Sequence, residues 1–201
     1  MRRHNIYWMI SCLLLLMFNV VLLTERINEV VSEKDDIHPG ESVIDSYQSS
    51  FIDLLENDGL PIQDMPMLDI TDNSVKVLSD LLVDDSVLFV CRVSQFQCQD
   101  CASYALEKAI EMVGKDSTRM QLLFLCEYEY RSLKIFIDEH PNTNGYGVFQ
   151  TSVIELPIEA RTSPYFFTLS KDLVVHDVFV PEVGNPIRSE IYWNSICEKW
   201  R

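Results

Sequence analysis

Two cysteines separated by two residues, Cys98 and Cys101, constrain this chain of 201 residues more than any other feature. They follow the apolar run Val87–Val90 and open a segment with helical periodicity. This order predicts two thiols at the N-terminus of a helix, directly after a strand. The partial positive charge of a helix N-terminus favours a thiolate. A two-residue spacer lets the thiols close a small disulfide ring, so the pair can accept or release two electrons.

The elements around these cysteines follow a β-α-β-α order. A nearly all-apolar strand is expected over residues 86–93, and such a strand needs cover on both faces, as in the centre of a parallel sheet. The helix that follows is expected to end at Gly114. A second apolar strand over 122–126 and a helix over 130–139 come next. Short connections between these elements imply parallel strands with right-handed crossovers.

The sequence pattern of the C-terminal third predicts a β-hairpin followed by a helix. Pro164 precedes the β-prone run Tyr165–Leu169, and a turn separates it from a second strand over 173–180. An Asn-Pro pair then begins a helix over 185–200. Residues 142–156 are expected to be a loop followed by a segment that is part strand and part turn.

The N-terminus carries an apolar segment, Ile6–Leu23, which holds no charged residue and follows Arg2 and Arg3. Its length is near the lower end of a bilayer span, and the arginines predict a cytoplasmic N-terminus with the rest of the chain outside. A cleaved signal peptide would need a shorter apolar core and a small-residue cleavage site. Cys12 lies inside the run, which does not fit a lipoprotein signal. An uncleaved transmembrane anchor fits better than a buried globular helix.

Three parts of the chain follow from these patterns. Residues 1–24 form a cytoplasmic tail and transmembrane anchor, and residues 25–60 a charged stalk with a helical spacer over 41–57. Residues 61–201 form the folded domain, which begins with an extended proline-marked stretch and a short strand near 75–78. The sequence leaves open whether the 41–57 helix packs on the domain, separates it from the membrane, or associates with another chain.

Charge and metal-ligand spacing exclude several functions. The formal net charge is −15, which argues against nucleic acid as a partner and is explained by solubility. A structural zinc site needs four ligands, but there is no second Cys-x-x-Cys pair and the four histidines are scattered. We therefore expect neither a metal nor another cofactor. The isolated cysteines Cys91, Cys126 and Cys197 lie in apolar segments and are expected to be buried, without a structural disulfide.

The combined pattern resembles the thioredoxin superfamily, most closely its membrane-tethered, extracytoplasmic TlpA/ResA-type branch. The Cys98-Gln99-Asp100-Cys101 motif carries the resemblance, together with Thr162-Ser163-Pro164 ahead of the hairpin. The stretch 65–81 matches that branch's lead-in to the domain. The resemblance implies an α/β fold, in which helices flank a central mixed sheet, and a thiol–disulfide oxidoreductase in the periplasm.

The resemblance also implies roles for individual residues. Cys98 would be the exposed nucleophile and Cys101 the resolving cysteine. Pro164 would follow a cis peptide bond, and Ser163 would offer backbone groups to a bound protein disulfide, with Phe96 adding apolar contact surface. A membrane thiol carrier would supply electrons.

Two residues depart from the family pattern: Gln97 stands where tryptophan is usual, and Asp100 where proline is usual. The helix N-terminus should lower the pKa of Cys98, whereas the negative charge of Asp100 should raise it. We therefore expect the pKa of Cys98 to be only moderately lowered. A poorly stabilised thiolate favours a reductase over a strong oxidant. The same departures support an alternative, a thioredoxin-like module that binds proteins or peptides without catalysis.

Overall fold

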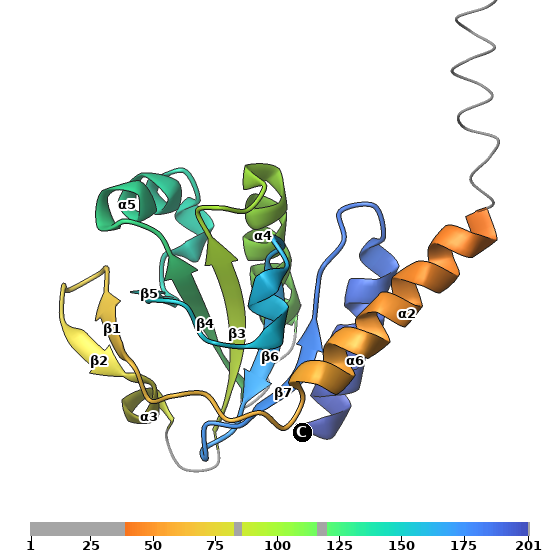
Figure 1. Ribbon diagram of the computed structural model, residues 1–201. Helices are drawn as coiled ribbons and strands as arrows, with labels where there is room; N and C mark the ends of the chain where they lie inside the picture. The colour runs from red at the N-terminus through yellow and green to blue at the C-terminus, as the bar shows by residue number, and fades with distance from the viewer. Residues whose placement is uncertain (1–38, 83–85, 116–119, 201) are drawn as a thin grey trace, which may run out of the picture. The chain divides into compact units, whose positions relative to one another are not determined.

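The computed structural model describes residues 39–82, 86–115 and 120–200. The chain divides into two compact units, Met1–Gln48 and Ser49–Arg201. Helix α2 (Pro39–Asn57) contains the point of division. The second unit holds a sheet of seven strands with helices around it, and it carries both cysteines of the motif (Figure 1).

The sheet has the strand order β2-β1-β5-β4-β3-β6-β7. Neighbours β3, β4 and β5 run parallel, and every other pair is antiparallel. The mixed character arises because a hairpin is attached at each side of the parallel centre. The strands are β1 (Pro66–Asp69), β2 (Val75–Val77), β3 (Val87–Ser94), β4 (Met120–Glu127), β5 (Gly147–Gln150), β6 (Tyr165–Leu169) and β7 (Val175–Phe179).

Strand β3 lies between β4 and β6 and is buried on both faces, as its continuous apolar sequence predicts. Side chains alternate between the two faces of a strand. Phe89, Cys91 and Val93 accordingly belong to one apolar cluster, and Leu88 and Val90 belong to another. The two clusters form the core on either side of the sheet.

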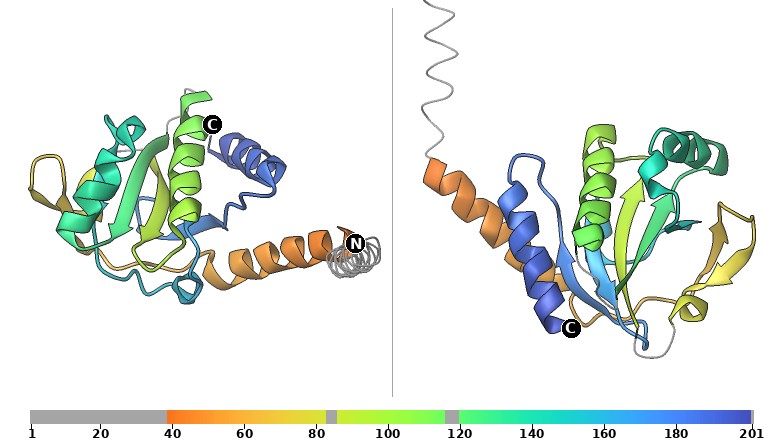
Figure 2. Two further views of the ribbon diagram at one scale, coloured as in Figure 1. Left: turned by 90° about the horizontal axis from the view of Figure 1, so that it is seen from above. Right: turned by 180° about the vertical axis from the view of Figure 1, so that it is seen from behind.

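Helices cover the first of these faces. Helix α4 (Gln99–Lys115) lies beside α6 (Pro186–Lys199), and α5 (Tyr130–Asp138) packs on the same cluster (Figure 2). The predicted apolar stripe of α4 is the face that contacts the sheet. Its residues Ala102, Ala105, Leu106, Ala109 and Met112 are buried, and Val113 is half-buried.

The opposite face is covered mainly by short elements. Helix α3 (Leu78–Leu81) and the 3₁₀ helix η2 (Pro157–Ala160) lie on this face, whereas the 3₁₀ helix η1 (Pro141–Thr143) contacts α4 and α5 on the first face. Leu78 of α3 and Ile158 of η2 both belong to the second cluster. The long connection between β5 and β6 therefore packs on the sheet instead of running free across the surface.

The last turns of α2, from Ser49 onward, belong to the second unit. The Asn57 side chain is fully buried, and its Oδ1 accepts a hydrogen bond from the Ile158 amide at 3.0 Å. Asp53 is buried beside the Arg161 guanidinium at 2.6 Å. This end of the helix is therefore part of the folded unit and does not act only as a spacer.

The predicted order of helices and strands is confirmed for α2, β3, α4, β4, α5, the β6–β7 hairpin and α6. The expected extended stretch contains a further strand, β1, and several boundaries differ: α4 continues through Gly114 to Lys115, β4 begins at Met120, and the expected loop after α5 begins as η1. Asn185 and Pro186 begin α6 as predicted, but the Asn185 side chain makes no capping hydrogen bond. The predicted anchor, Ile6–Leu23, lies outside the described residues. Within the described ranges, no helix is long and apolar enough to span a membrane.

Candidate active site

The two cysteines of the motif lie where β3 passes into α4. Gln97 donates its backbone N–H to the Ser94 carbonyl at 3.1 Å, which closes a turn after the strand. The Cys98 carbonyl accepts the first helical hydrogen bond, from the Ala102 amide at 3.0 Å. Cys98 therefore sits at the helix N-terminus and Cys101 in the first turn, as the sequence predicts.

Cys98 has the environment of a reactive thiolate. Its residue is exposed, and its sulfur accepts a hydrogen bond from the Cys101 backbone N–H at 3.4 Å. The Cys101 thiol, that backbone N–H and the N–H of Asp100 lower the pKa of Cys98 below that of an ordinary cysteine. The negative charge of Asp100 opposes this shift, as expected from the sequence. A lowered pKa places more of the nucleophilic form at neutral pH.

Cys101 has the opposite bias. It is half-buried, and its thiol donates to the Cys98 sulfur. This hydrogen bond, then burial, then the negative charges of Cys98 and Asp100 raise the pKa of Cys101. When the pair loses its first proton, Cys98 is therefore the sulfur that takes the negative charge and Cys101 keeps its proton. Both cysteines are free thiols in this structure.

The Gln97 side chain joins the cysteine turn to the segment before β6. Its Oε1 accepts the Ser94 backbone N–H at 2.9 Å, and its Nε2 donates to the Ser163 carbonyl at 2.9 Å. Residues 66 positions apart are thereby brought together at the edge of the site. Sequence analysis identified Gln97 only as a departure from the family pattern and missed this contact.

The expectation of a cis peptide bond at Pro164 is wrong for this structure. All peptide bonds between described residues are trans, including Ser163–Pro164. The trans form is the lower-energy isomer for any X–Pro bond, and the chain bends at residues 161–163 before it enters β6. Pro164 is nevertheless buried, and Ser163 remains beside the cysteine turn through its contact with Gln97.

A cavity of about 200 Å³ separates the cysteine turn from the segment before β6. Phe96, which is 72% exposed, lies on one side of it, and Arg161 and Thr162 lie on the other. The remaining lining comes from Ser94, Gln97, Glu127, Val153, Glu159 and Tyr165. Phe96 and Thr162 therefore line one cavity, whereas Ser163 and Pro164 are not among its lining residues.

A second cavity, of about 290 Å³, lies toward α5. Gln95, Gln97 and Gln99 line it from the cysteine turn. Tyr128 and α5 complete the wall, including the exposed side chain of Ile135. Gln97 therefore borders both cavities, and Cys98 lies between Gln97 and Gln99 in the sequence.

A buried ionic cluster lies beneath the first cavity. Arg92, on β3, is fully buried, and it donates to both carboxylate oxygens of Glu159, at 2.8 and 3.1 Å. Its guanidinium also reaches Glu127 at 3.2 Å, Thr151 Oγ1 at 3.1 Å and the Ser152 carbonyl at 3.1 Å. Burial alone would raise the pKa of Glu159, but Arg92 and the hydroxyl of Tyr165 hold it below its usual value.

This cluster fixes the start and the middle of the 151–164 segment to the central strand. The sequence offered one signal for it, since Arg92 is the single charged residue within the run 86–94. A charged side chain in a central strand must find buried partners. The sequence could not show which carboxylates they would be.

The other described cysteines are buried, as predicted. Cys91 and Cys126 are fully buried and Cys197 is nearly so. Burial raises the pKa of Cys126 to about 12 and raises that of Cys91 well above its usual value. Thiols with such raised pKa values stay protonated at neutral pH and are poor nucleophiles. Cys91 and Cys126 therefore contribute to the packing of the core.

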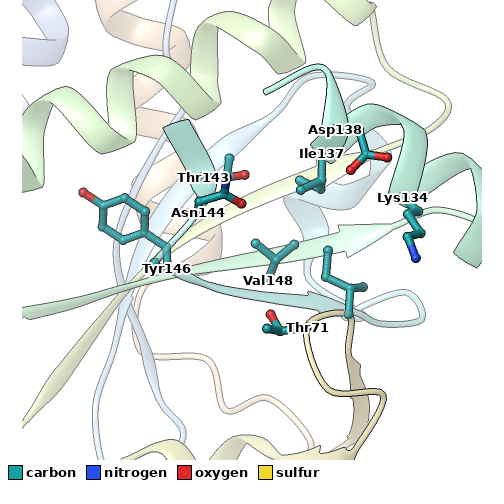
Figure 3. Close-up of a pocket in the computed structure, with 10 residues that line it drawn as sticks. Thr71, Lys134, Ile137, Asp138, Thr143, Asn144, Tyr146 and Val148 are labelled. Carbon is teal, nitrogen blue, oxygen red and sulfur yellow. The ribbon is translucent and has the colours of Figure 1, made fainter. Parts of the chain in front are cut away.

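A further cavity, of about 210 Å³, lies away from the thiols between α5 and β5 (Figure 3). Ile137 and Val148 contribute apolar walls, and Lys134 and Asp138 extend from α5 nearby (Figure 3). None of the residues lining it belongs to the cysteine turn. Within the described ranges, no three histidine, cysteine or acidic side chains gather closely enough to hold a metal ion.

Comparison with known proteins defines the class of fold. No family model and no curated protein sequence matches the chain. Solved structures do match. A candidate thiol:disulfide interchange protein DsbE from Chlorobium tepidum is 15% identical with a TM-score of 0.57, and the match covers 72% of this chain and 99% of that one. The thioredoxin domain of a thiol-disulfide oxidoreductase from Bacteroides vulgatus is 8% identical with a TM-score of 0.53, covering 72% and 98%.

The second unit therefore has a thioredoxin-like fold. At these identities the likeness establishes the fold alone, so the chemistry of this chain has to be argued from its own residues.

Proposed function

We propose that this protein is a thiol–disulfide oxidoreductase that acts on protein disulfides through Cys98 and Cys101. The observation that carries the proposal is the pairing of an exposed sulfur with a lowered pKa and a half-buried thiol that donates to it, both at the start of one helix. The thioredoxin-like fold and the cavity beside Phe96 support the same conclusion.

The proposed reaction is a two-step exchange. The Cys98 thiolate attacks one sulfur of a substrate disulfide, a mixed disulfide forms, and the first substrate thiolate leaves and takes up a proton. Cys101 then loses its proton and attacks the Cys98 sulfur, which releases the second substrate thiol. Two electrons have passed to the substrate, and Cys98 and Cys101 are left joined by a disulfide. The raised pKa of Cys101 keeps it protonated until the mixed disulfide has removed the Cys98 charge.

The direction of exchange is proposed to be reductive. Asp100 opposes the stabilisation of the Cys98 thiolate, which disfavours the dithiol form relative to a strong oxidant. Electrons would then come from a membrane thiol carrier. We further propose that Ile6–Leu23 anchors the chain in a membrane with the folded unit in the periplasm, since Arg2 and Arg3 precede the apolar segment. A reduction potential near that of a strong oxidant would refute the reductive direction.

The decisive experiment is an insulin disulfide reduction assay with the full chain. The wild-type protein should accelerate reduction by dithiothreitol, and Cys98→Ser should fall to the uncatalysed rate. Equal rates for the two proteins would exclude the proposed enzymatic function.

A binding module without turnover is the second candidate. Two observations favour it: Gln97 and Asp100 depart from the pattern of active relatives, and Gln97 Nε2 already occupies the Ser163 carbonyl. In that case Cys98→Ser would retain the affinity of the wild type for an unfolded polypeptide, and neither protein would reduce insulin.

A further inference from the structure

The Gln97 side chain is held at both ends by backbone groups from different parts of the fold. Ser94 belongs to the end of β3, and Ser163 precedes β6. The 2.9 Å contacts of Gln97 with the Ser94 N–H and the Ser163 carbonyl therefore link the end of β3 to the segment before β6. Ser94 and Gln97 both line the first cavity, so this bridge lies beside it. Among the described residues, no other hydrogen bond joins positions 95–98 to positions 161–164.

The segment that this bridge holds has little regular structure of its own. Between β5 and β6 the structure has a single 3₁₀ helix, η2. Arg92 fixes Thr151, Ser152 and Glu159 to the central strand. Ser163 lies four residues beyond Glu159 and directly follows Thr162, which lines the cavity. The Arg161 guanidinium holds this segment to Asp53 of α2 at 2.6 Å, and Gln97 is the contact that ties it to the cysteine turn.

We propose that Gln97 is a positioning residue that sets the gap between the cysteine turn and the 161–164 segment, and that it thereby selects polypeptide disulfides over small ones. This inference rests on the proposed function. A polypeptide must fit its backbone through the gap, so its rate depends on the width of the gap. A small disulfide such as glutathione disulfide needs only the exposed sulfur of Cys98. Both side-chain hydrogen bonds of Gln97 go to Ser94 and Ser163, whereas the Cys98 sulfur accepts its hydrogen bond from Cys101, so the two effects are separable.

The test is Gln97→Met, which preserves side-chain length and removes both hydrogen bonds. The matched control is Gln99→Met, the same change on the other side of Cys98. Gln99 is exposed and makes no hydrogen bond to the 161–164 segment among the described residues. We expect Gln97→Met to lower kcat/KM for insulin by roughly 3- to 10-fold, mainly through KM, as the loss of ordinary hydrogen bonds allows. The rate with glutathione disulfide should stay within about twofold of the wild type.

Hydrogen exchange of the Ser94 amide gives a readout that does not depend on activity. Exchange should be faster in Gln97→Met, because the side-chain acceptor is gone, and unchanged in Gln99→Met. Equal losses with both disulfides, an unchanged or higher kcat/KM for insulin, or unaltered Ser94 exchange would each overturn the inference.

The same experiment separates this inference from the proposed function. If the wild type reduces no insulin, the proposed function fails whatever Gln97 does. The positioning role is then decided by Ser94 exchange and by the amide chemical shifts of residues 161–163, and a lack of change in both would refute it.

Discussion

The sulfur of Cys98 illustrates how few groups define a reactive residue. Hydrogen bonds from Cys101 and from the helix-start amides lower its pKa, and the charge of Asp100 raises it. Replacing Asp100 by Asn removes the opposing charge, so the pKa should fall further and alkylation at neutral pH should become faster. The measurement is the rate of reaction with iodoacetamide against pH. The Cys98 phase should lie below the range of an ordinary cysteine and move lower in the variant, while Cys101 reacts at higher pH. A coincident profile for the two proteins would contradict this account.

Arg92 is the residue whose loss should damage the fold most selectively. Arg92→Met leaves Glu159 and Glu127 without their cation, and breaking a buried pair in this way destabilises a protein by about 3 kcal/mol. Urea unfolding measures the change. The double variant with Glu159→Gln should recover part of the loss, because one uncompensated carboxylate is gone. An Arg92→Met protein as stable as the wild type would show that the cluster contributes nothing net.

At the scale of single elements, β5 depends on a close approach to its neighbour. A Cβ at Gly147 would lie 2.9 Å from Leu123 Cδ1 of β4 and 2.9 Å from a ring carbon of Phe149. Gly147→Ala should therefore destabilise the fold by about 1–3 kcal/mol through overpacking. Gly114→Ala is the matched control, since nothing lies within 4 Å of its Cβ and it is helical. It should stabilise α4 by about 0.5–1 kcal/mol. The measurement is the thermal unfolding temperature of each variant relative to the wild type. Equal changes in the two variants would refute the close-packing argument.

At the scale of the whole molecule, several carboxylates make the free energy of unfolding depend on pH in the acidic range. The pKa values of Glu159, Asp177 and Asp69 are each held low: burial raises them, but hydrogen bonds and nearby cations lower them further. Their contribution is complete above the pKa of the unfolded chain, where glutamate has its usual value of 4.5, and is lost as pH falls through the lower folded values. Burial raises the pKa of Asp53, so protonation of this residue at low pH favours the folded state and partly offsets the loss.

The free energy of unfolding should therefore decline from about pH 4.5 downward, and Glu159→Gln should make that decline shallower. Urea unfolding at a series of pH values measures the slope. A slope unchanged by the substitution would exclude Glu159 as a source of acid sensitivity.

Much of this protein was determined locally by its sequence. Apolar runs and helical periodicity predicted β3, α4, β4, α5 and the β6–β7 hairpin, because each depends on residues close together in the chain. The same local order placed Cys98 at a helix start. The burial of Cys91 and Cys126 followed from the apolar segments that contain them, whereas the exposure of Cys98 was expected from the family resemblance.

Only the tertiary structure decided which distant residues complete the site. The insertion of β5 between β1 and β4, the Arg92–Glu159 pair across 67 positions and the Gln97–Ser163 bridge across 66 positions depend on how strands pair and connections fold back. A local pattern fixes which face of an element is apolar, but it does not specify the partner. The Thr-x-Pro motif by itself likewise did not determine the isomer of the Ser163–Pro164 bond, which is trans.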